Sequence, residues 1–258
     1  MACLRMLFWD QLSESIPTLQ QANKEKDILL MCELMQDAKQ VKHHKKKLVL
    51  LFSAMRHFAE QRRQEGWEVV YIAITQSASE KTWIDHGEDL IQSRKLQRVM
   101  LTKPSDFARW QELQAWKKTA KVPVEIAEDT RFYCTENRFS EWAQGRKQLR
   151  MEYFYREMRS QFEILMDHGK PCGGQWNYDA ENRKPPKEGL VIPAPFVQPP
   201  DTITQGVMAE VEKIFPDHFG STSGFNIGVT REQALASLAQ FIEQRLAMFG
   251  DYQDAMLE

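Results

Sequence analysis

Apolar runs typical of buried strands alternate with amphipathic stretches through roughly the first 130 residues. Runs such as ILLMC and VVYIAI are continuously apolar, which is typical of strands covered on both faces in a parallel sheet. Strands that alternate with helices imply right-handed crossovers and a doubly wound sheet. The pattern therefore predicts an α/β fold with five strands, at Leu4–Trp9, Asp27–Leu34, Glu68–Ile74, Arg98–Thr102 and Val124–Ala127, and with helices at Val41–Gly66, Ser79–Arg94 and Asp106–Lys121.

The pattern changes beyond residue 135. A helix is predicted from Arg138 to His168, with Gly169 as its stop. The segment that follows holds seven of the eleven prolines, which disfavour regular structure, so we expect an extended connector. Aromatic side chains in this connector are costly to leave in water, which favours a connector that lies across a protein surface. These aromatic residues are Trp176, Tyr178 and Phe196.

Two more helices are predicted near the end of the sequence, at Ile203–Phe215 and Thr230–Phe249. The second has a clear start signal, because Thr230 can cap the helix and Gln233 follows three residues later. We therefore divide the chain into an α/β domain at 1–135, a helix and proline-rich connector at 136–202, and a helical segment at 203–258.

Composition limits the class of protein. A content of 42% hydrophobic and 10% aromatic residues is ample for a core, which excludes a disordered polypeptide. No apolar run reaches the length of a membrane span, and the first residues do not have the pattern of a secretory signal. The four cysteines are scattered, as expected for reduced thiols in a cytoplasmic protein. The net charge of −2 provides no overall attraction to nucleic acid.

The usual catalytic signatures are absent from the sequence. It contains no glycine-rich phosphate loop, no GxSxG elbow and no HExxH motif. Cys172 has only His168 close to it in sequence, which is too little for a zinc site or an activated nucleophile. We therefore expect no catalytic residue and no metal ligand, and a binding module or a part of a larger enzyme is the better interpretation.

Polar residues follow the first two predicted strands. Asp10 follows the first, and Cys32, Glu33 and Asp37 lie at the end of the second. In doubly wound sheets a ligand usually lies beyond the carboxyl ends of the strands, near the switch in strand order. These residues are therefore candidates for ligand binding. The alternatives are a turn or capping role for Asp10 and simple burial for Cys32.

Two basic segments are of interest. His43 and His44 precede Lys45–Lys47, but adjacent histidines on a helix point about 100° apart, so a solvated helix start is favoured over a metal site. A cationic first turn is unfavourable to the helix dipole, which hints weakly at an anionic partner. Basic and aromatic residues also alternate in Gly145–Arg159. That segment fits an interdomain seam better than direct contact with DNA, although both are consistent with it.

Several segments together resemble the bacterial photolyase/cryptochrome group that carries an iron–sulfur cluster, also called photolyase-related proteins. The segments are FWDQLS (Phe8–Ser13), VKHHKKKLVLLFSAMRHFAE (Val41–Glu60), AQGRKQLRMEYFYREMR (Ala143–Arg159), GGQWNYDAENRKPP (Gly173–Pro186) and DYQDAM (Asp251–Met256). The last resembles the family's entry into its helical catalytic domain. The resemblance spans nearly the whole chain.

The resemblance implies a Rossmann-like antenna domain, a long connector and a helical domain that binds FAD and a [4Fe–4S] cluster. Members repair (6-4) photoproducts in DNA or act as blue-light sensors, and 6,7-dimethyl-8-ribityllumazine serves as their antenna. On this basis the chain is the amino-terminal portion, inactive alone, with its own helical domain and damaged DNA as partners and no membrane. None of its cysteines matches a cluster ligand. A free-standing nucleotide-binding α/β protein of common ancestry is the alternative.

The resemblance also implies a set of residues for the lumazine. They are Asp10, Cys32, Glu33, Met35, Asp37, Gln40 and, in the loop after the fourth strand, Asp106. The sequence departs from the family at three of the nearby positions. Trp9 replaces a usual glycine, Asp37 a glutamate and Gln40 a common aromatic residue. A tryptophan beside the pocket can either stack on the chromophore or fill its place, and the sequence does not choose between these.

Overall fold

The structure is a computed structural model that describes residues 2–20, 22–77, 81–185 and 190–253. The chain forms two compact units. The first consists of Met1–Arg131 and Val197–Leu235, and the second consists of Phe132–Phe196 and Ala236–Glu258.

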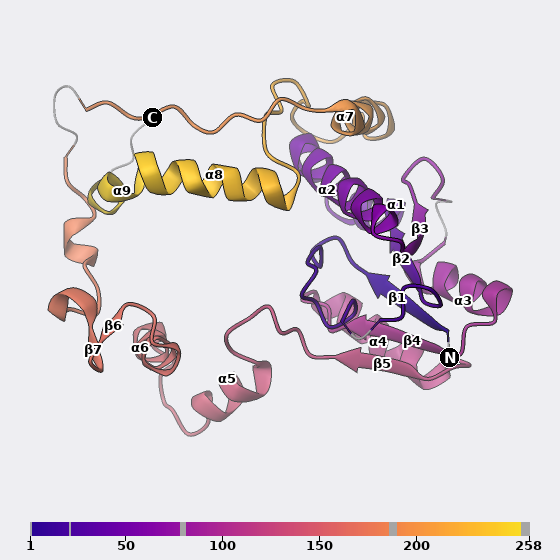
Figure 1. Ribbon diagram of the computed structural model, residues 1–258, viewed down its shortest axis with the longest axis horizontal. Helices are drawn as coiled ribbons and strands as arrows, with labels where there is room; N and C mark the ends of the chain where they lie inside the picture. The colour runs from indigo at the N-terminus through magenta and orange to yellow at the C-terminus, as the bar shows by residue number, and fades with distance from the viewer. Residues whose placement is uncertain (1, 21, 78–80, 186–189, 254–258) are drawn as a thin grey trace. The chain divides into compact units, whose positions relative to one another are not determined.

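The first unit is built on a five-stranded sheet in which every pair of neighbours is parallel. Its strand order is β3-β2-β1-β4-β5, which confirms the predicted doubly wound, Rossmann-like α/β fold (Figure 1). The strands are β1 (Cys3–Leu7), β2 (Ile28–Cys32), β3 (Glu68–Ile72), β4 (Arg98–Thr102) and β5 (Val124–Ala127). The strand β2 is buried along almost its whole length, as its continuous apolar run predicts, and β1 is buried although Arg5 interrupts its apolar residues. The other continuous apolar run, in β3, is only partly buried.

Helices cover both faces of this sheet. They are α1 (Met35–Gln40), α2 (Lys45–Gln64), α3 (Trp83–Arg94) and α4 (Phe107–Thr119). Successive residues of β2 alternate between two cores: Leu29 and Met31 pack with α2, whereas Ile28 and Leu30 pack with α3 and α4. The helix α1 was not predicted. Of the helix predicted at Ser79–Arg94, the first two residues lie outside the described residues.

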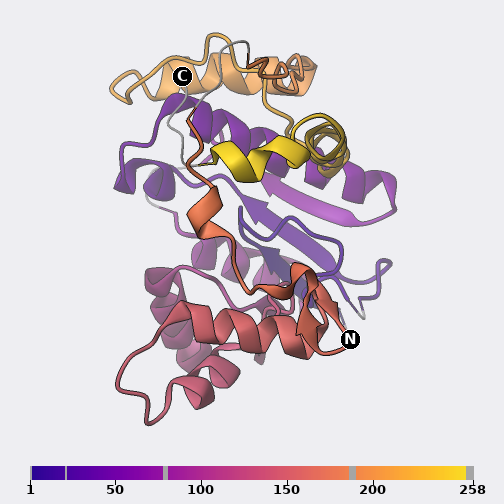
Figure 2. The ribbon, with the colours of Figure 1, turned by 90° about the vertical axis from the view of Figure 1, so that its left-hand side faces the viewer.

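The helix α7 (Thr202–Ile214) belongs to the first unit although it follows the connector. It lies beside α2 in both ribbon views (Figures 1 and 2). Val207, Val211 and Phe215 are buried in the same core as Phe52 and Met55 of α2. The predicted helix at 203–215 therefore forms almost as expected, and it adds a further helix to one face of the α/β unit.

In the second unit, the prediction of one helix from Arg138 to His168 is wrong. Two helices form instead, α5 (Glu136–Ala143) and α6 (Met151–Phe162), and the chain turns between them at Gly145, whose φ is +73°. The helix α6 ends at Glu163, which adopts the left-handed conformation with φ of 53°. Arg159 holds this end closed, because its guanidinium donates to the carbonyls of Ile164 and Leu165.

Gly169 therefore does not stop a helix. It lies with His168 in the turn of a short antiparallel hairpin between β6 (Met166–Asp167) and β7 (Lys170–Pro171). Both turn residues have positive φ, 46° and 76°, which is the requirement of a two-residue type I′ turn. A local turn preference thus outweighs the helical periodicity that led to the prediction.

The connector contains two single-turn 3₁₀ helices, Cys172–Gly174 and Asp179–Glu181, and no regular structure from 190 to 201, as predicted. Trp176 lies against the guanidinium groups of Arg156 and Arg159, 5.4 and 5.5 Å from its ring centroid, so this part of the connector packs on α6.

The last predicted helix, Thr230–Phe249, is in fact two, α8 (Arg231–Gln244) and α9 (Leu246–Tyr252), separated by Arg245. The predicted start signal of α8 is confirmed by reciprocal bonds. The Gln233 N–H donates to the Thr230 hydroxyl, and the Thr230 N–H donates to the Gln233 side chain, both at 3.2 Å. The segment Asp251–Met256 lies partly outside the described residues.

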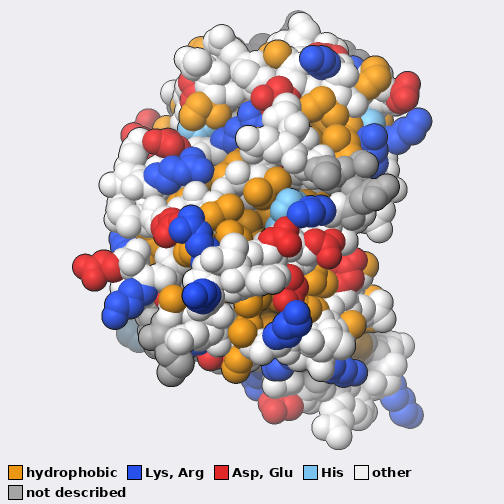
Figure 3. All heavy atoms as spheres, turned by 90° about the vertical axis from the view of Figure 1, so that its right-hand side faces the viewer, with side chains coloured by type: hydrophobic (Ala, Val, Ile, Leu, Met, Phe, Trp, Pro, Cys, Tyr) orange, Lys and Arg blue, Asp and Glu red, His pale blue; other side chains and the backbone are white. Residues whose placement is uncertain are grey.

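The surface carries charges of both signs. On the face drawn in Figure 3, basic and acidic side chains are interspersed and apolar side chains lie between them. In the part of the chain that the structure describes, no helix is long and apolar enough to cross a membrane. Within the same residues, no group of three or more His, Cys, Asp and Glu side chains is placed to hold a metal ion.

Candidate functional site

A cavity of about 290 Å³ lies beyond the carboxyl ends of β1, β2 and β4. The chain runs from β1 to β2 and β3 on one side and to β4 and β5 on the other, so the strand order reverses at β1. The loops that follow β1 and β4 diverge there, which is why doubly wound sheets open a crevice at this point. Segments 6–10, 30–47 and 104–109 supply most of the lining, together with Trp83.

The structure brings five of the seven predicted site residues together. Asp10, Cys32, Asp37, Gln40 and Asp106 all line the cavity. The two others lie elsewhere: Met35 packs against the core beneath α2, and Glu33 is fully buried beside the same helix. A role of the five in ligand binding stays a prediction.

Glu33 is an acceptor in a buried network. Its carboxylate receives two bonds from Arg56, at 2.8 and 2.9 Å, one from the Tyr71 hydroxyl at 2.5 Å and one from the Ile74 N–H at 2.7 Å. Arg56 also pairs with Glu210 of α7 at 2.5 Å. The network therefore joins β2, β3, α2 and α7. Burial comes first among the causes that raise the pKa of the Tyr71 hydroxyl, and the adjacent Glu33 carboxylate raises it further.

The most organised part of the cavity wall surrounds Arg109, which sequence reasoning missed. Its guanidinium pairs with Asp37 at 2.5 Å, and it lies 5.1 Å from the centre of the Phe8 ring and 5.6 Å from that of Trp83. Asp106 caps α4 by accepting the Arg109 N–H at 2.8 Å, and this cap fixes the first turn of the helix at the cavity. The sequence signal that could have identified Arg109 is its position three residues after Asp106, a residue type that often caps helices.

The setting of Cys32 favours the protonated thiol. Burial raises its pKa to about 12, and the Asp37 carboxylate raises it further while Arg109 lowers it. Burial also lowers the pKa of His43 in the cavity lining, and Lys47 and His218 lower it further. The cavity therefore presents a neutral thiol and a neutral imidazole at physiological pH.

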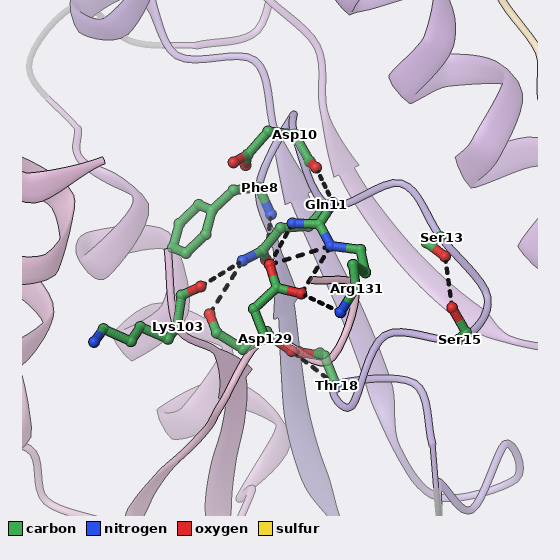
Figure 4. Close-up of polar contacts among 10 residues, drawn as sticks. Phe8, Asp10, Gln11, Ser13, Ser15, Thr18, Lys103, Asp129 and Arg131 are labelled. Carbon is green, nitrogen blue, oxygen red and sulfur yellow. Dashed lines mark hydrogen bonds and ion pairs between the residues drawn. The ribbon is translucent and has the colours of Figure 1, made fainter. Parts of the chain in front are cut away.

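The loop after β1 is held by hydrogen bonds to its neighbours (Figure 4). The Gln11 amide donates to the carbonyls of Thr102 and Lys103, and Arg131 donates to the carbonyl of Asp10. Although burial favours the neutral acid, hydrogen bonds from Arg131 lower the pKa of Asp129, so this pair is charged. The Asp10 carboxylate points away from Arg131 in Figure 4 and has no hydrogen-bond partner among the described residues.

The basic segment before α2 has a structural explanation. His44 caps the helix, since its Nδ1 accepts the Lys46 N–H at 3.0 Å. Lys45 is buried and pairs with Glu212 of α7 at 2.6 Å. In the second basic segment, Arg146 stacks on Trp142 and Glu157 pairs with Arg138 at 2.6 Å. These contacts lie within the second unit, and the choice between a seam and a DNA contact stays open.

Two proteins and one protein family are similar to this chain in sequence. A relative described as "(6-4) photolyase", from Agrobacterium fabrum, is 41% identical over all 258 residues, and the chain spans 51% of its length. An uncharacterized protein of Acanthamoeba polyphaga mimivirus is 23% identical over 145 residues, which are 54% of this chain and 70% of that protein. The family described as deoxyribodipyrimidine photo-lyase-related protein matches residues 5–227. The chain therefore belongs to the deoxyribodipyrimidine photo-lyase-related protein family.

Proposed function

We propose that the first unit is an antenna domain whose cavity binds a heteroaromatic chromophore, 6,7-dimethyl-8-ribityllumazine. The observation that carries this proposal is the cavity at the reversal of strand order, with five of the seven expected residues on its walls. Its volume of about 290 Å³ is close to the lower end, about 300 Å³, of small-molecule sites.

The side chains present fit such a ligand. Phe8, Trp9 and Trp83 supply apolar walls for an aromatic ring system. The Asp10 carboxylate and the Gln40 amide have no hydrogen-bond partner among the described residues, so both can receive the polar groups of a ring or a ribityl chain. The bound chromophore would supply light absorption, and the residues of this chain would bind it, orient it and exclude water.

For the whole protein we propose light-driven repair of damaged DNA, because the relative that is 41% identical is described as a (6-4) photolyase. FAD and a [4Fe–4S] cluster would then belong to a helical domain outside this chain, and the cytoplasm would be its compartment. Illumination of the full-length protein with a lesion-bearing oligonucleotide tests this, because bases that stay unrestored would favour a blue-light sensor.

A titration of this chain with the lumazine tests the antenna proposal directly. We expect its fluorescence anisotropy to rise and its absorption band to shift on binding. Asp10→Asn removes the charge and one acceptor oxygen of the carboxylate, and Gln40→Ala removes the side-chain amide. Neither change touches a capping or core contact. Loss of one hydrogen bond of about 1 kcal/mol would raise Kd about fivefold.

Asp217→Asn is the matched control, because Asp217 is an exposed carboxylate of the same unit outside the cavity lining. An unchanged Kd is expected for this variant. A flat titration of the unaltered chain would refute the antenna proposal. Binding of a nucleotide in place of the lumazine would favour the alternative of a nucleotide-binding α/β protein.

A further inference from the structure

Two tryptophans in contact connect the cavity with the core that packs under α3 and α4. Trp83, at the start of α3, lines the cavity and is 3% exposed. Its ring meets Trp116 of α4 edge to face, with 5.6 Å between the ring centroids and an interplanar angle of 87°. At this separation the two indoles are in van der Waals contact, which is close enough for rapid exchange of an electron.

Each of these indoles donates its N–H to a carboxylate on the other helix. Trp83 Nε1 donates to Glu112 of α4 at 2.9 Å, and Trp116 Nε1 donates to Glu88 of α3 at 2.6 Å. Buried indoles need a partner for the N–H, so the crossed pair also fastens α3 to α4. A carboxylate in this position has a second property, since an oxidised indole is a strong N–H acid and the carboxylate can accept its proton.

Each indole has one carboxylate at its N–H, but a nearby cation favours a positive hole on Trp116 over one on Trp83. The Arg109 guanidinium lies 5.6 Å from the centre of the Trp83 ring and disfavours a positive charge there. Among the described residues no such cation lies over the ring of Trp116. Trp9 also lines the cavity, but among the described residues its ring contacts only that of His43, with 6.5 Å between the ring centroids. It therefore makes no contact with another indole.

We propose that Trp83 and Trp116 form a photo-oxidation relay, which rests on the proposed function because a light-excited heteroaromatic ligand is its oxidant. Trp83 gives one electron to the excited ligand, and Trp116 then gives one electron to Trp83. Trp116 releases its Nε1 proton to Glu88 and becomes a neutral radical, while Glu88 becomes a neutral acid. The electron and the proton return when the charges recombine. The relay therefore shortens the time for which the ligand stays excited, and it competes with transfer of that excitation to another chromophore.

Time-resolved spectroscopy of the lumazine complex of this chain tests the relay. Binding is established first by anisotropy for every variant, so that each comparison is made between loaded proteins. After a light pulse we expect the absorption of a tryptophan radical in the unaltered chain. Trp83→Phe should lose that signal and lengthen the fluorescence lifetime of the ligand, whereas Trp116→Phe should keep the quenching and lose only the long-lived radical.

Two further variants test whether the signals depend on this pair of tryptophans or on any buried tryptophan of the unit. Trp67→Phe replaces a buried indole in the core beneath α2 and should change neither signal. Glu88→Gln keeps the shape of the pair and should shorten the life of the radical, because the proton has no acceptor. A complex that binds the lumazine but shows the same lifetime in Trp83→Phe overturns the relay alone. Absence of lumazine binding overturns the antenna proposal and the relay together.

Discussion

The buried network around Glu33 allows us to predict how much the free energy of unfolding falls when one of its members is replaced. Glu33→Gln keeps the size of the side chain but replaces one acceptor oxygen with an amide group. That side chain is 0% exposed and now receives four hydrogen bonds from three residues. The new amide N–H₂ would lie against the N–H and O–H groups that now donate to the carboxylate. Arg56 would also lose the negative charge of Glu33. The variant therefore leaves a buried cation only partly compensated.

Removing one partner of a buried ion pair destabilises a protein by about 3–5 kcal/mol. Arg56 retains Glu210 at 2.5 Å and is itself 18% exposed, which moderates the loss. We therefore expect a loss near the lower limit, about 3 kcal/mol, out of a total stability of about 5–15 kcal/mol. The effect should be concentrated in the elements that the network joins.

Native-state hydrogen exchange with peptide resolution is the appropriate assay, because two compact units do not guarantee a single two-state transition. Peptides from β2, α2 and α7 should lose protection together. The control is Glu68→Gln on β3, whose surface pair with Arg94 spans 3.0 Å between two half-exposed side chains. A surface pair of this kind contributes at most about 1 kcal/mol.

Equal and small losses of protection in Glu33→Gln and Glu68→Gln would refute the reasoning. The same pair of variants also separates the structural role of Glu33 from ligand binding. The Glu33 carboxylate is occupied by Arg56, Tyr71 and Ile74, so lumazine affinity should be unchanged in Glu33→Gln wherever the unit stays folded. A large loss of lumazine affinity in a folded Glu33→Gln variant would show that Glu33 belongs to the binding site.

Three further predictions concern the first unit and the cysteines. Gly220→Ala should lower the free energy of unfolding by about 1–3 kcal/mol, because its φ is +78° and an added Cβ would lie 2.0 Å from Nε2 of His44. Hydrogen bonds from Lys45 and Thr222 lower the pKa of Glu212 to about 2 from 4.5, so its stabilising contribution is present above about pH 4.5 and is lost as pH falls toward 2; Glu212→Gln should remove this part of the acid-unfolding curve. Alkylation followed by mass mapping should label the exposed Cys172 long before Cys32, whose pKa is about 12.

Each of these three has a control and a contrary outcome. Gly224→Ala has a similar positive φ, +66°, but its Cβ would meet only Lys46 Nζ at 3.9 Å, so a loss as large as that of Gly220→Ala would contradict the role assigned to the His44 contact. Identical acid unfolding of the unaltered chain and Glu212→Gln would exclude the proposed linkage. Rapid labelling of Cys32 at neutral pH would show that its thiol is neither buried nor protonated.

Much of the first unit could be predicted from local pattern. Hydrophobic strand-like runs identified all five strands, and the capping residues Thr230 and Gln233 identified the start of α8. Errors arose where two local signals competed. Helical periodicity continued through 138–168, but the preference of Gly145 and Gly169 for positive φ broke the chain into two helices and a hairpin.

The candidate site was only partly predictable. Asp10, Cys32 and Asp106 follow strands, and any parallel sheet brings such residues to one edge. Alternation along the strand places adjacent Cys32 and Glu33 on opposite faces of the sheet. The sequence does not show which of them faces the cavity, because that depends on which face α2 covers. Arg109 and Trp83 join the cavity through the packing of α3 and α4, which no local spacing encodes.

The sequence by itself determined the five strands of the sheet and the helices α2, α3, α4 and α7 of the first unit, because burial leaves a short-range periodicity in the chain. Only the tertiary structure decided the strand order, the reversal at β1 and the crossed pairs Trp83–Glu112 and Trp116–Glu88. The physical reason is that these contacts join residues far apart in the chain, and their geometry depends on how whole layers pack rather than on neighbouring residues.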